Sequence, residues 1–447
     1  MRTSGLAALL CTAALIVTPA AAGSGTDAGS AASGPPLALG PTETVSTFPT
    51  PSAESTQYPN PIAVTDARGT VTAVWAAGTL AAAQRDPGGH WGAPVGLGSC
   101  PAAMPSCVTT YAVVVDAAGT ATVAWSTWDT VLTDIYVATL APGGTWSAPT
   151  HVSAQHTSAY VGLAAAGHDR AVLAFAGGTW RHPTVTALYK APGVRWEAAA
   201  RRTFRDANQP VVGVSDHGVA VLVVRRGLRH DQLMRSYRFR PGSGWGRAHT
   251  LGAAMKLDLV PYSLVTAPTG RSLLAYLYDP LPDSAQVWRP AVRARVMTRR
   301  GTWRKAHTLA PAGSVSSEYL PVTIGRKAVV AWSTTREAIR VATLAPGTGW
   351  KVRTAYPRRS GQVWQVEHGP GDDLTMLWNH GIPGPALRLG RYTPAGWSPA
   401  LPGPPDIDEM GVFGCIAPLP DGSGLLLTNG TITGGFSVLA HRFAPAS

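Results

Sequence analysis

Six acidic side chains could supply the pair of carboxyl groups that glycoside hydrolysis requires. One group would act as an acid and the other as a base or nucleophile, about 5 to 10 Å apart. These acids are Asp129, Asp134, Asp231, Asp279, Asp283 and Glu337. They belong to different segments, so the sequence leaves open whether any two converge, and each alone is typical of a solvated loop acid. We therefore assign no catalytic residue.

Other reactive patterns are missing from the sequence. It contains no H-E-x-x-H helix, no P-loop and no G-x-S-x-G elbow. The twelve histidines are scattered without the i, i+4 spacing of helical metal ligands. We predict no cofactor and no metal site.

Aromatic and arginine side chains could bind an acidic sugar. Ring faces stack on sugar C–H groups, and guanidinium groups hold anions. One set recurs where an apolar run begins, at Tyr58, Tyr111, Tyr160, Tyr262, Tyr319 and Trp364. A second set occupies non-repetitive segments, at Trp128, Trp180, Arg181, Arg229, Trp288, Arg289 and Arg336. The recurring rings have an alternative role, because periodic aromatics usually pack between repeats.

The charge balance favours an acidic partner. The chain has 447 residues and a net charge of +12, nearly all from arginine. This suits an anionic glycan, a cell-wall polymer or an extracellular protein, although a codon bias towards arginine would give the same balance. Nucleic acid is a weaker candidate, because the arginines between Arg170 and Arg304 form no continuous run.

The N-terminus predicts secretion. Residues 1–22 have a positive start, a short apolar run and small residues at a cleavage site, as in a signal peptide. Residues 23–35 read as a flexible linker, and no later run is apolar enough to span a membrane. In an oxidising compartment, Cys100 and Cys107 are expected to form a disulfide. Cys415 is expected to be a buried thiol.

A repeated unit fills residues 36–447. Each unit has two apolar runs joined by a D-x-x-G turn, then a third run, a PGG-type turn, a tryptophan and a fourth run. The turn tryptophans are Trp91, Trp146, Trp196, Trp245, Trp303, Trp350 and Trp397. The runs are short, rich in Val, Ala and Thr, and bounded by turn residues, which predicts strands. This spacing is typical of four-stranded β-propeller blades.

The predicted fold is all-β, a single propeller of about eight blades, with seven as the alternative. The last unit holds three strands, and the segment from Pro35 resembles a fourth, so pairing the two ends would close the ring. In such a ring the second-to-third loops share one face with the fourth-to-first loops, here called the loop face. The D-x-x-G and PGG turns share the other face, the turn face. The non-repetitive residues fall mainly on the loop face, where function is expected.

The D-x-x-G, V-A-W and A-P-G-G-T-W-S-A-P segments resemble the repeats of secreted bacterial propellers of the sialidase-like (BNR) type. The resemblance covers nearly the whole predicted propeller and implies the fold. The Asp and the G-T-W of a sialidase Asp box stand here in different turns, so sialidase catalytic residues do not transfer. Propellers of this kind include lectins, hydrolases, lyases and adhesion modules.

Two functions remain at this stage. The first is a secreted, non-catalytic module that binds a glycan, a cell-wall polymer or a protein. The alternative is a propeller-type glycoside hydrolase or polysaccharide lyase. The sequence says nothing about oligomeric state.

Overall fold

The computed structural model describes residues 34–49, 60–98, 100, 107–128, 132–155, 160–179, 181–226, 233–253, 262–278, 289–316, 319–357, 360–379, 387–404, 414–432 and 435–446. The predicted signal peptide and residues 23–33 of the predicted linker lie outside these ranges. Gly34, near the end of that linker, is buried, and its amide donates a hydrogen bond to the carbonyl of Trp397.

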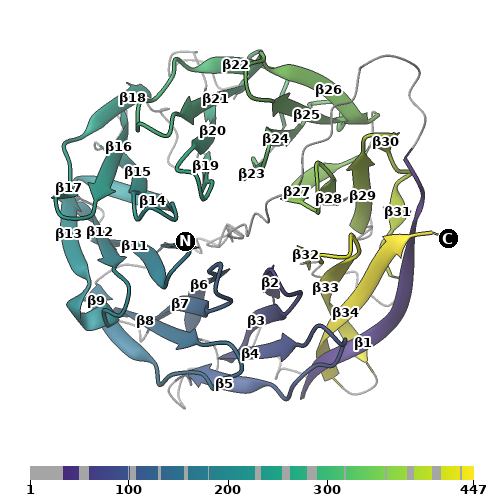
Figure 1. Cartoon of the computed structure of the whole chain (residues 1–447), viewed down its shortest axis with the longest axis horizontal. Helices are drawn as coiled ribbons and strands as arrows, with labels where there is room; N and C mark the ends of the chain where they lie inside the picture. Colours follow the sequence, from purple (N-terminus) through teal and green to yellow (C-terminus); the bar gives the residue numbers. More distant parts are fainter. Residues whose placement is uncertain are drawn as a thin grey trace, which may run out of the picture.

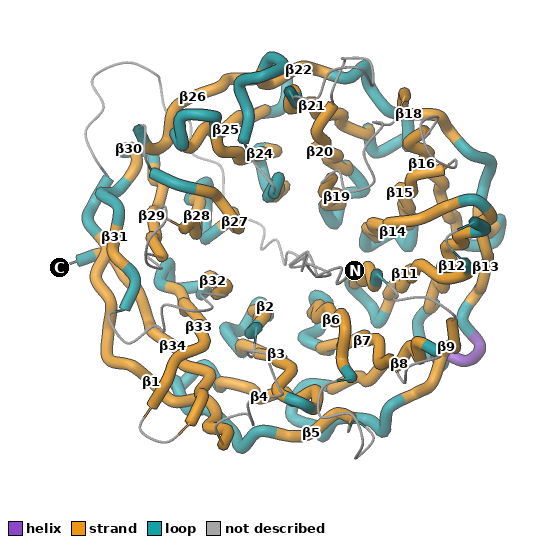
Figure 2. Tube along the Cα trace, turned by 180° about the vertical axis from the view of Figure 1, so that it is seen from behind, coloured by secondary structure: helices purple, strands orange, loops and turns teal. Residues whose placement is uncertain are grey.

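The chain forms an eight-bladed β-propeller. Its strands pair into eight separate antiparallel sheets, and Figure 1 and Figure 2 show these sheets arranged as a closed ring of blades. The prediction of eight blades is confirmed and the count of seven is wrong. We number the blades along the chain, so that blade 1 starts at β2 and blade 8 contains both β1 and β34.

Each blade has the same strand order from the centre outwards. The innermost strands are β2 (Ile62–Thr65), β6 (Val108–Val115), β10 (Val161–Ala166), β14 (Ala207–Val214), β19 (Tyr262–Thr266), β23 (Val322–Ile324), β27 (Gln362–His368) and β32 (Gly414–Pro418). The second strands are β3 (Val71–Ala77), β7 (Ala121–Trp128), β11 (Arg170–Gly178), β15 (Ala220–Arg226), β20 (Ser272–Tyr278), β24 (Ala328–Ser333), β28 (Leu374–Asn379) and β33 (Gly424–Ile432).

The outer half of each blade holds the third and fourth strands. The third strands are β4 (Thr79–Arg85), β8 (Thr133–Leu140), β12 (Pro183–Lys190), β16 (Leu233–Arg240), β21 (Ala291–Met297), β25 (Ile339–Leu344), β29 (Leu387–Thr393) and β34 (Gly435–Pro445). The fourth strands are β5 (Val95–Gly98), β9 (Thr150–Gln155), β13 (Ala200–Arg205), β17 (Gly244–Trp245) with β18 (His249–Ala253), β22 (His307–Ala310), β26 (Lys351–Tyr356), β30 (Gly396–Trp397) with β31 (Leu401–Pro402), and β1 (Leu37–Pro49). A short 3-10 helix, η1 (Trp196–Ala198), precedes β13.

The hydrophobic core is divided among the blade interfaces. The described residues form eight clusters of buried side chains, and each cluster joins two neighbouring blades. Both faces of a blade are therefore covered, which explains why β3 and β24 are buried along most of their length. Trp125 and Trp332, near the ends of second strands, are fully buried. The turn tryptophans also pack against these clusters, as in the contact of Trp397 with Tyr356 of the preceding blade.

The D-x-x-G turns form as the sequence predicts. Asp66 Oδ1 accepts hydrogen bonds from the amides of Arg68 and Thr70, and Asp116 Oδ1 accepts the equivalent pair. The glycine of the first turn, Gly69, has a φ of +91°, which L side chains rarely adopt. In blade 4 the neighbouring Ser215 takes the capping role, and its Oγ accepts from the amide of Val219.

The two ends of the chain close the ring. β1 runs antiparallel to β34 from Leu37 opposite Pro445 to Pro49 opposite Gly435. The N-terminal strand thereby supplies the fourth strand that the last unit lacks, as predicted. Closure in this way removes an exposed sheet edge.

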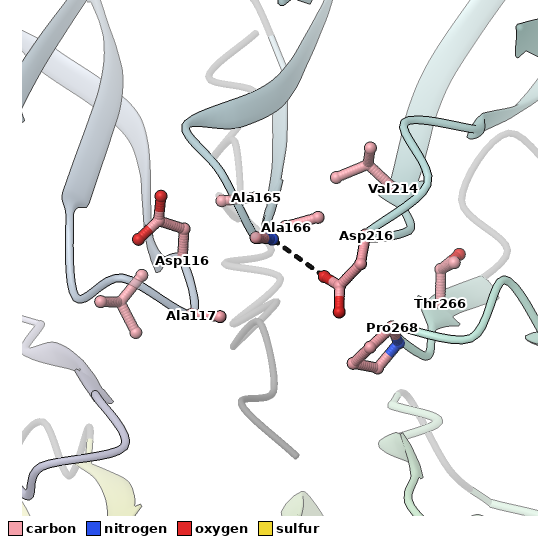
Figure 3. Close-up of a pocket in the computed structure, with 10 residues that line it drawn as sticks. Asp116, Ala117, Ala165, Ala166, Val214, Asp216, Thr266 and Pro268 are labelled. Atoms are coloured by element: carbon pink, nitrogen blue, oxygen red, sulfur yellow. Dashed lines mark hydrogen bonds between the residues drawn. The ribbon is translucent and has the colours of Figure 1, made fainter. Parts of the chain in front are cut away.

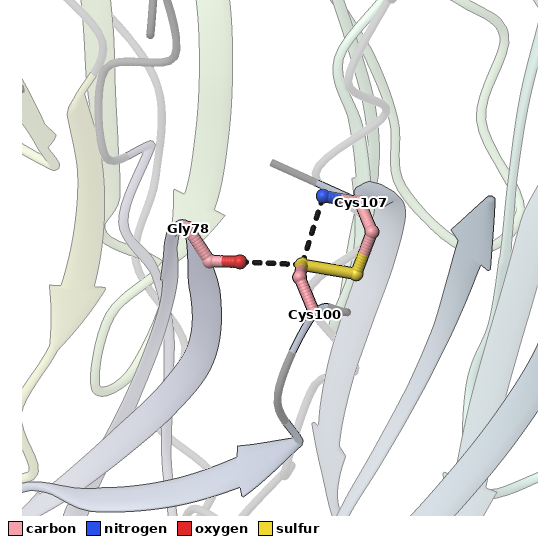
Figure 4. The surroundings of a disulfide bond; sticks show 3 residues. All are labelled: Gly78, Cys100 and Cys107. Atoms are coloured by element: carbon pink, nitrogen blue, oxygen red, sulfur yellow. Dashed lines mark hydrogen bonds between the residues drawn. A yellow bond between two sulfur atoms is a disulfide. The ribbon is translucent and has the colours of Figure 1, made fainter. Parts of the chain in front are cut away.

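The predicted disulfide between Cys100 and Cys107 is present, as Figure 4 shows. It spans the connection from β5 of blade 1 to β6 of blade 2. The amide of Cys107 donates to Cys100 Sγ at 2.8 Å, and the carbonyl oxygen of Gly78 lies 2.6 Å from the same sulfur. Cys415 is buried in the interface of blades 8 and 1.

Candidate functional site

Part of the predicted loop-face site lies outside the described residues. This applies to Tyr58, Trp180, Arg229 and Trp288, and also to the acids Asp129, Asp231, Asp279 and Asp283. The structure places the other predicted residues in three different environments.

Two of the recurring tyrosines are interior residues. Tyr111 and Tyr262 are 6% and 4% exposed. The hydroxyl of Tyr111 donates to the carbonyl of Asn60, and that of Tyr262 donates to the carbonyl of Gln209, in each case on the preceding blade. Burial raises the pKa of Tyr262 above its usual range. These two rings hold neighbouring blades together and present no face to a ligand.

The other recurring aromatics, Tyr160, Tyr319 and Trp364, are half-buried. At the loop face, Trp128 at the end of β7 is 44% exposed, and Arg181, Arg289 and Arg336 are also exposed. These four residues belong to blades 2, 3, 5 and 6. The described part of the loop face therefore presents one tryptophan and three arginines, which are spread around the propeller.

The two described loop-face acids do not form a catalytic pair. Asp134 Oδ1 lies 2.9 Å from Nε2 of His151, whose ring contacts Tyr136. Glu337 is exposed on the turn between β24 and β25. They belong to blades 2 and 6, which stand on opposite sides of the ring (Figure 1).

A small notch opens on the turn face. It is lined by the first-to-second turns of blades 2 to 5 and has a volume of about 40 Å³, which is room for about one water molecule. Asp216 Oδ1 accepts from the amide of Gly167, and Asp116 Oδ2 accepts from the amide of Asp169 (Figure 3 draws the first bond). The carboxylates of blades 2 and 4 thereby clamp the turn of blade 3, which makes their role structural.

Basic residues are concentrated in one half of the ring. Residues 195–359, from the end of blade 3 to the end of blade 6, contain 28 Lys and Arg against 9 Asp and Glu. The rest of the chain contains 9 Lys and Arg against 16 Asp and Glu. The net positive charge of the protein therefore comes entirely from this half.

The exposed cations of this half lie on its outer side. Twelve of them occupy the third-to-fourth turns and the fourth strands of blades 3 to 6, and all are exposed. We call this set the basic wall: Arg195, Arg201, Arg202, Arg205, Arg240, Arg247, Arg299, Arg300, Arg304, Lys305, Lys351 and Arg353. The same segments (191–205, 240–253, 298–310 and 345–357) contain a single acid, Glu197.

The other four blades provide an internal control. Their equivalent segments are 393–404, 37–49, 86–98 and 141–155, and these contain no Lys or Arg. A fourth strand can thus close a blade without any basic residue. The basic wall is an addition to the fold rather than a requirement of it.

Several wall arginines are held by backbone carbonyls. Arg201 Nη2 donates to the carbonyl of Val152 at 2.5 Å, and Arg202 Nη1 donates to that of Trp245 at 2.6 Å. Apart from Lys351, no residue of the basic wall forms an ion pair with another described residue. A carbonyl orients a guanidinium without cancelling its net charge, so the wall keeps its positive potential.

Two arginines of this half lie close enough to other cations for their pKa values to be affected. Arg271, on the first-to-second turn of blade 5, has its pKa lowered by burial and then by the positive charges of Arg299 and Arg304. Arg238 likewise has its pKa lowered by burial and by Arg240.

Among the described residues, no group of three or more His, Cys, Asp or Glu side chains could hold a metal ion. No helix within the described ranges is long and apolar enough to cross a membrane.

Comparisons with known proteins add similarity of fold. No family model and no curated protein sequence matches the chain. Among solved structures, it is similar to the polysaccharide lyase Uly1, at 9% identity and a TM-score of 0.46 over 84% of this chain and 87% of that one. It is also similar to the Hadza microbial sialidase Hz136, at 10% identity and a TM-score of 0.36 over 70% of this chain and 74% of that one.

A third similar structure is prolyl oligopeptidase B from Galerina marginata, at 11% identity and a TM-score of 0.44 over 71% of this chain. The match spans about half of that protein, 49% of its length. Likeness at this level supports no statement about activity. The functional argument therefore rests on the residues of this chain.

The basic wall was missed in the sequence because its members are separated by whole blades. They form no run, and only their common place in each repeat connects them. Aligning the fourth runs on the turn tryptophans would have shown the arginines gathering in four successive units.

Proposed function

We propose that the protein is a secreted, non-catalytic β-propeller that binds an anionic glycan or cell-wall polymer. The observation that supports this is the basic wall, set against four equivalent blade edges with no Lys or Arg. The Cys100–Cys107 disulfide is in keeping with an extracellular location.

The size of the ligand follows from the strength of exposed ion pairs. Each contributes about 0.2 to 1 kcal/mol in water. A monosaccharide that meets two or three guanidinium groups would then bind no more tightly than the millimolar range. A chain that meets eight or more could reach the micromolar range. The ligand is therefore a polymer rather than a small acidic sugar.

The test is a binding measurement with the protein beginning at Gly23. Dextran sulfate, hyaluronate and poly(glycerol phosphate) are the anionic probes, and neutral dextran is the matched control. We expect binding of at least one anionic polymer at about 50 mM salt and a large loss at about 500 mM, because the Debye length shortens. Equal binding of neutral dextran, or binding of no polymer, would overturn the proposal.

The same samples test the enzymatic alternative. A hydrolase or lyase acting through loop-face acids would release shorter products from the bound polymer. Intact polymer after prolonged incubation supports a pure binding role, whereas product release would replace it with the alternative.

A further inference from the structure

We infer that the bound polymer is a linear anionic polysaccharide that lies along the outer wall of blades 3 to 6, away from the loop face. This inference rests on the proposed function and adds the surface and the type of chain. It has three supports, which are the position of the wall, a repeated pair of side chains beside it, and the chemistry of that pair.

The wall is continuous around the circumference. β13, β18, β22 and β26 follow one another along the outer edge of the ring (Figure 1). In β13 the successive residues Arg201, Arg202 and Thr203 are all exposed, as are Lys351, Val352 and Arg353 in β26. An extended chain could cross these four edges in succession, whereas the loop-face cations Arg181, Arg289 and Arg336 stand singly on separate blades.

A pair of side chains repeats beside the wall, between the third and fourth strands. In blades 4, 5 and 6, the fourth strand has one extra residue at a register shift, and the shift is followed by an arginine of the third strand that faces a threonine of the fourth strand. These pairs are Arg235 with Thr250, Arg293 with Thr308, and Arg340 with Thr354. In blades 1 and 2 the same register shift is followed by Ala81 with Gly96 and by Tyr136 with His151. The shift itself therefore does not require the Arg–Thr pair.

The pair has the chemistry of a polysaccharide site. The threonines of the three pairs are exposed and the arginines are half-buried, with the guanidinium of Arg293 3.6 Å from the centroid of the Tyr278 ring. The accessible part of a guanidinium can bind a sulfate, carboxylate or phosphate group, and the threonine hydroxyl can donate a hydrogen bond to a sugar hydroxyl or accept one from it. One pair in each of blades 4, 5 and 6 gives a periodic surface that matches a repeating chain.

Nucleic acid fits this surface less well. Single strands are held by exposed aromatic rings on which bases stack. Among the described residues, the exposed large hydrophobic side chain on the wall is Val352, and the exposed Trp128 belongs to blade 2. The disulfide also indicates an oxidising compartment.

The experiment compares two triple variants that change the net charge by the same amount. The wall variant is Arg247→Gln, Arg304→Gln and Arg353→Gln, three exposed residues whose side chains make no hydrogen bond to another described residue. The loop-face variant is Arg181→Gln, Arg289→Gln and Arg336→Gln. Both are first checked for an unchanged thermal midpoint, and any wall position whose glutamine variant impairs folding is changed to methionine instead, which removes the same charge.

We expect the wall variant to bind the anionic polymer at least about tenfold more weakly, and the slope of log K against log salt to fall by about three, one for each lost contact. The loop-face variant should stay within about twofold of wild type, since exposed charges outside the contact surface act only through long-range, salt-screened attraction. Weaker binding by the loop-face variant, with near-normal binding by the wall variant, would overturn the inference and leave the proposed function intact. If the unmodified protein binds none of the anionic polymers, the proposed function itself fails.

Two further measurements identify the type of polymer that binds. Thr308→Val and Thr354→Val together should weaken polysaccharide binding while leaving the salt slope unchanged, because they remove hydroxyls and no charge. The order of affinity of dextran sulfate and hyaluronate identifies whether sulfate or carboxylate is preferred. Poly(glycerol phosphate) has no sugar ring, so wall-dependent binding of that probe alone would overturn the choice of a polysaccharide. Wall-dependent binding of double-stranded DNA without binding of any polysaccharide would overturn the choice of a polysaccharide.

Discussion

Arg85 of β4 donates two hydrogen bonds to the carboxylate of Glu43 in β1, from Nε to Oε2 at 3.1 Å and from Nη2 to Oε1 at 3.0 Å. The indole of Trp91 donates to the same carboxylate at 2.9 Å. This contact joins blade 1 to the outer strand of blade 8, at the seam where the chain closes the ring. At the interfaces held by Arg202 and Arg238, the guanidinium meets a backbone carbonyl instead.

We expect Glu43→Ala to lower the free energy of unfolding by about 2 to 4 kcal/mol, because it leaves a buried guanidinium without its counter-ion. The Arg85 side chain is only 7% exposed, which limits solvent compensation. Urea unfolding followed by tryptophan fluorescence measures the change. The control is Arg442→Gln, which removes a pair that is about half exposed and should cost at most about 1 kcal/mol. Equal losses in the two variants would contradict a special role for the seam.

We expect Glu367 to make the stability of the protein depend on pH. This residue of β27 accepts a hydrogen bond from Gln365, and burial raises its pKa to about 8 from 4.5. Because the folded state binds the proton more tightly, the stabilisation is complete below pH 4.5 and is lost as the pH rises through about 8. Glu367→Gln should therefore gain stability relative to wild type between these two values.

The free energies of unfolding of wild type and Glu367→Gln, measured by urea unfolding from pH 4 to pH 9, test this prediction. The difference should move in favour of the variant by up to about 1.4 kcal/mol for each pH unit between the two pKa values, as an upper bound. Glu337→Gln, at an exposed acid, should show no such trend. A constant difference for Glu367→Gln would contradict the prediction.

The disulfide should stabilise the connection between blades 1 and 2. It closes a loop across a sequence separation of 7 residues. Replacing both Cys100 and Cys107 by Ser should cost about 2 to 3 kcal/mol through the greater freedom of the unfolded chain. Thermal unfolding of wild type with and without reductant should reproduce the difference between wild type and variant. If reductant has no effect on wild type, the bond does not contribute as predicted.

Gly424 provides a packing prediction. A Cβ at this position would lie 2.3 Å from Cζ of Phe443, the fully buried residue opposite it in β34. Gly424→Ala should therefore cost about 1 to 3 kcal/mol through overpacking. Gly96→Ala in β5 is the matched control, since a Cβ there meets nothing within 4 Å. A similar unfolding midpoint for the two variants would contradict this account of the packing between β33 and β34.

Local features of the sequence predicted much of the fold. Asp66 and Asp116 cap turns within four residues of themselves, so their role can be read directly. The recurring tryptophans gave the period, and the three-stranded last unit implied the pairing of β1 with β34. Cys100 and Cys107 lie close enough in sequence for their pairing to be the simplest one.

The candidate site could not be assigned in the same way. Tyr111 and Tyr262 share a place in the repeat with other aromatics, and the sequence allowed either a binding rim or packing between blades. They are buried in the clusters between neighbouring blades, and their hydroxyls donate to the carbonyls of Asn60 and Gln209, about fifty residues earlier in the chain. Asp216 similarly binds Gly167 of the preceding blade rather than its own turn.

The sequence by itself determined the strands, their turns, the blade repeat and the closure of the ring, because each depends on contacts within one blade or on a pattern that recurs. Only the tertiary structure decided which side chains meet across blade interfaces and which face the solvent. Residues one blade apart become neighbours through the stacking of the sheets, and this also brings arginines from four separate repeats onto one outer wall.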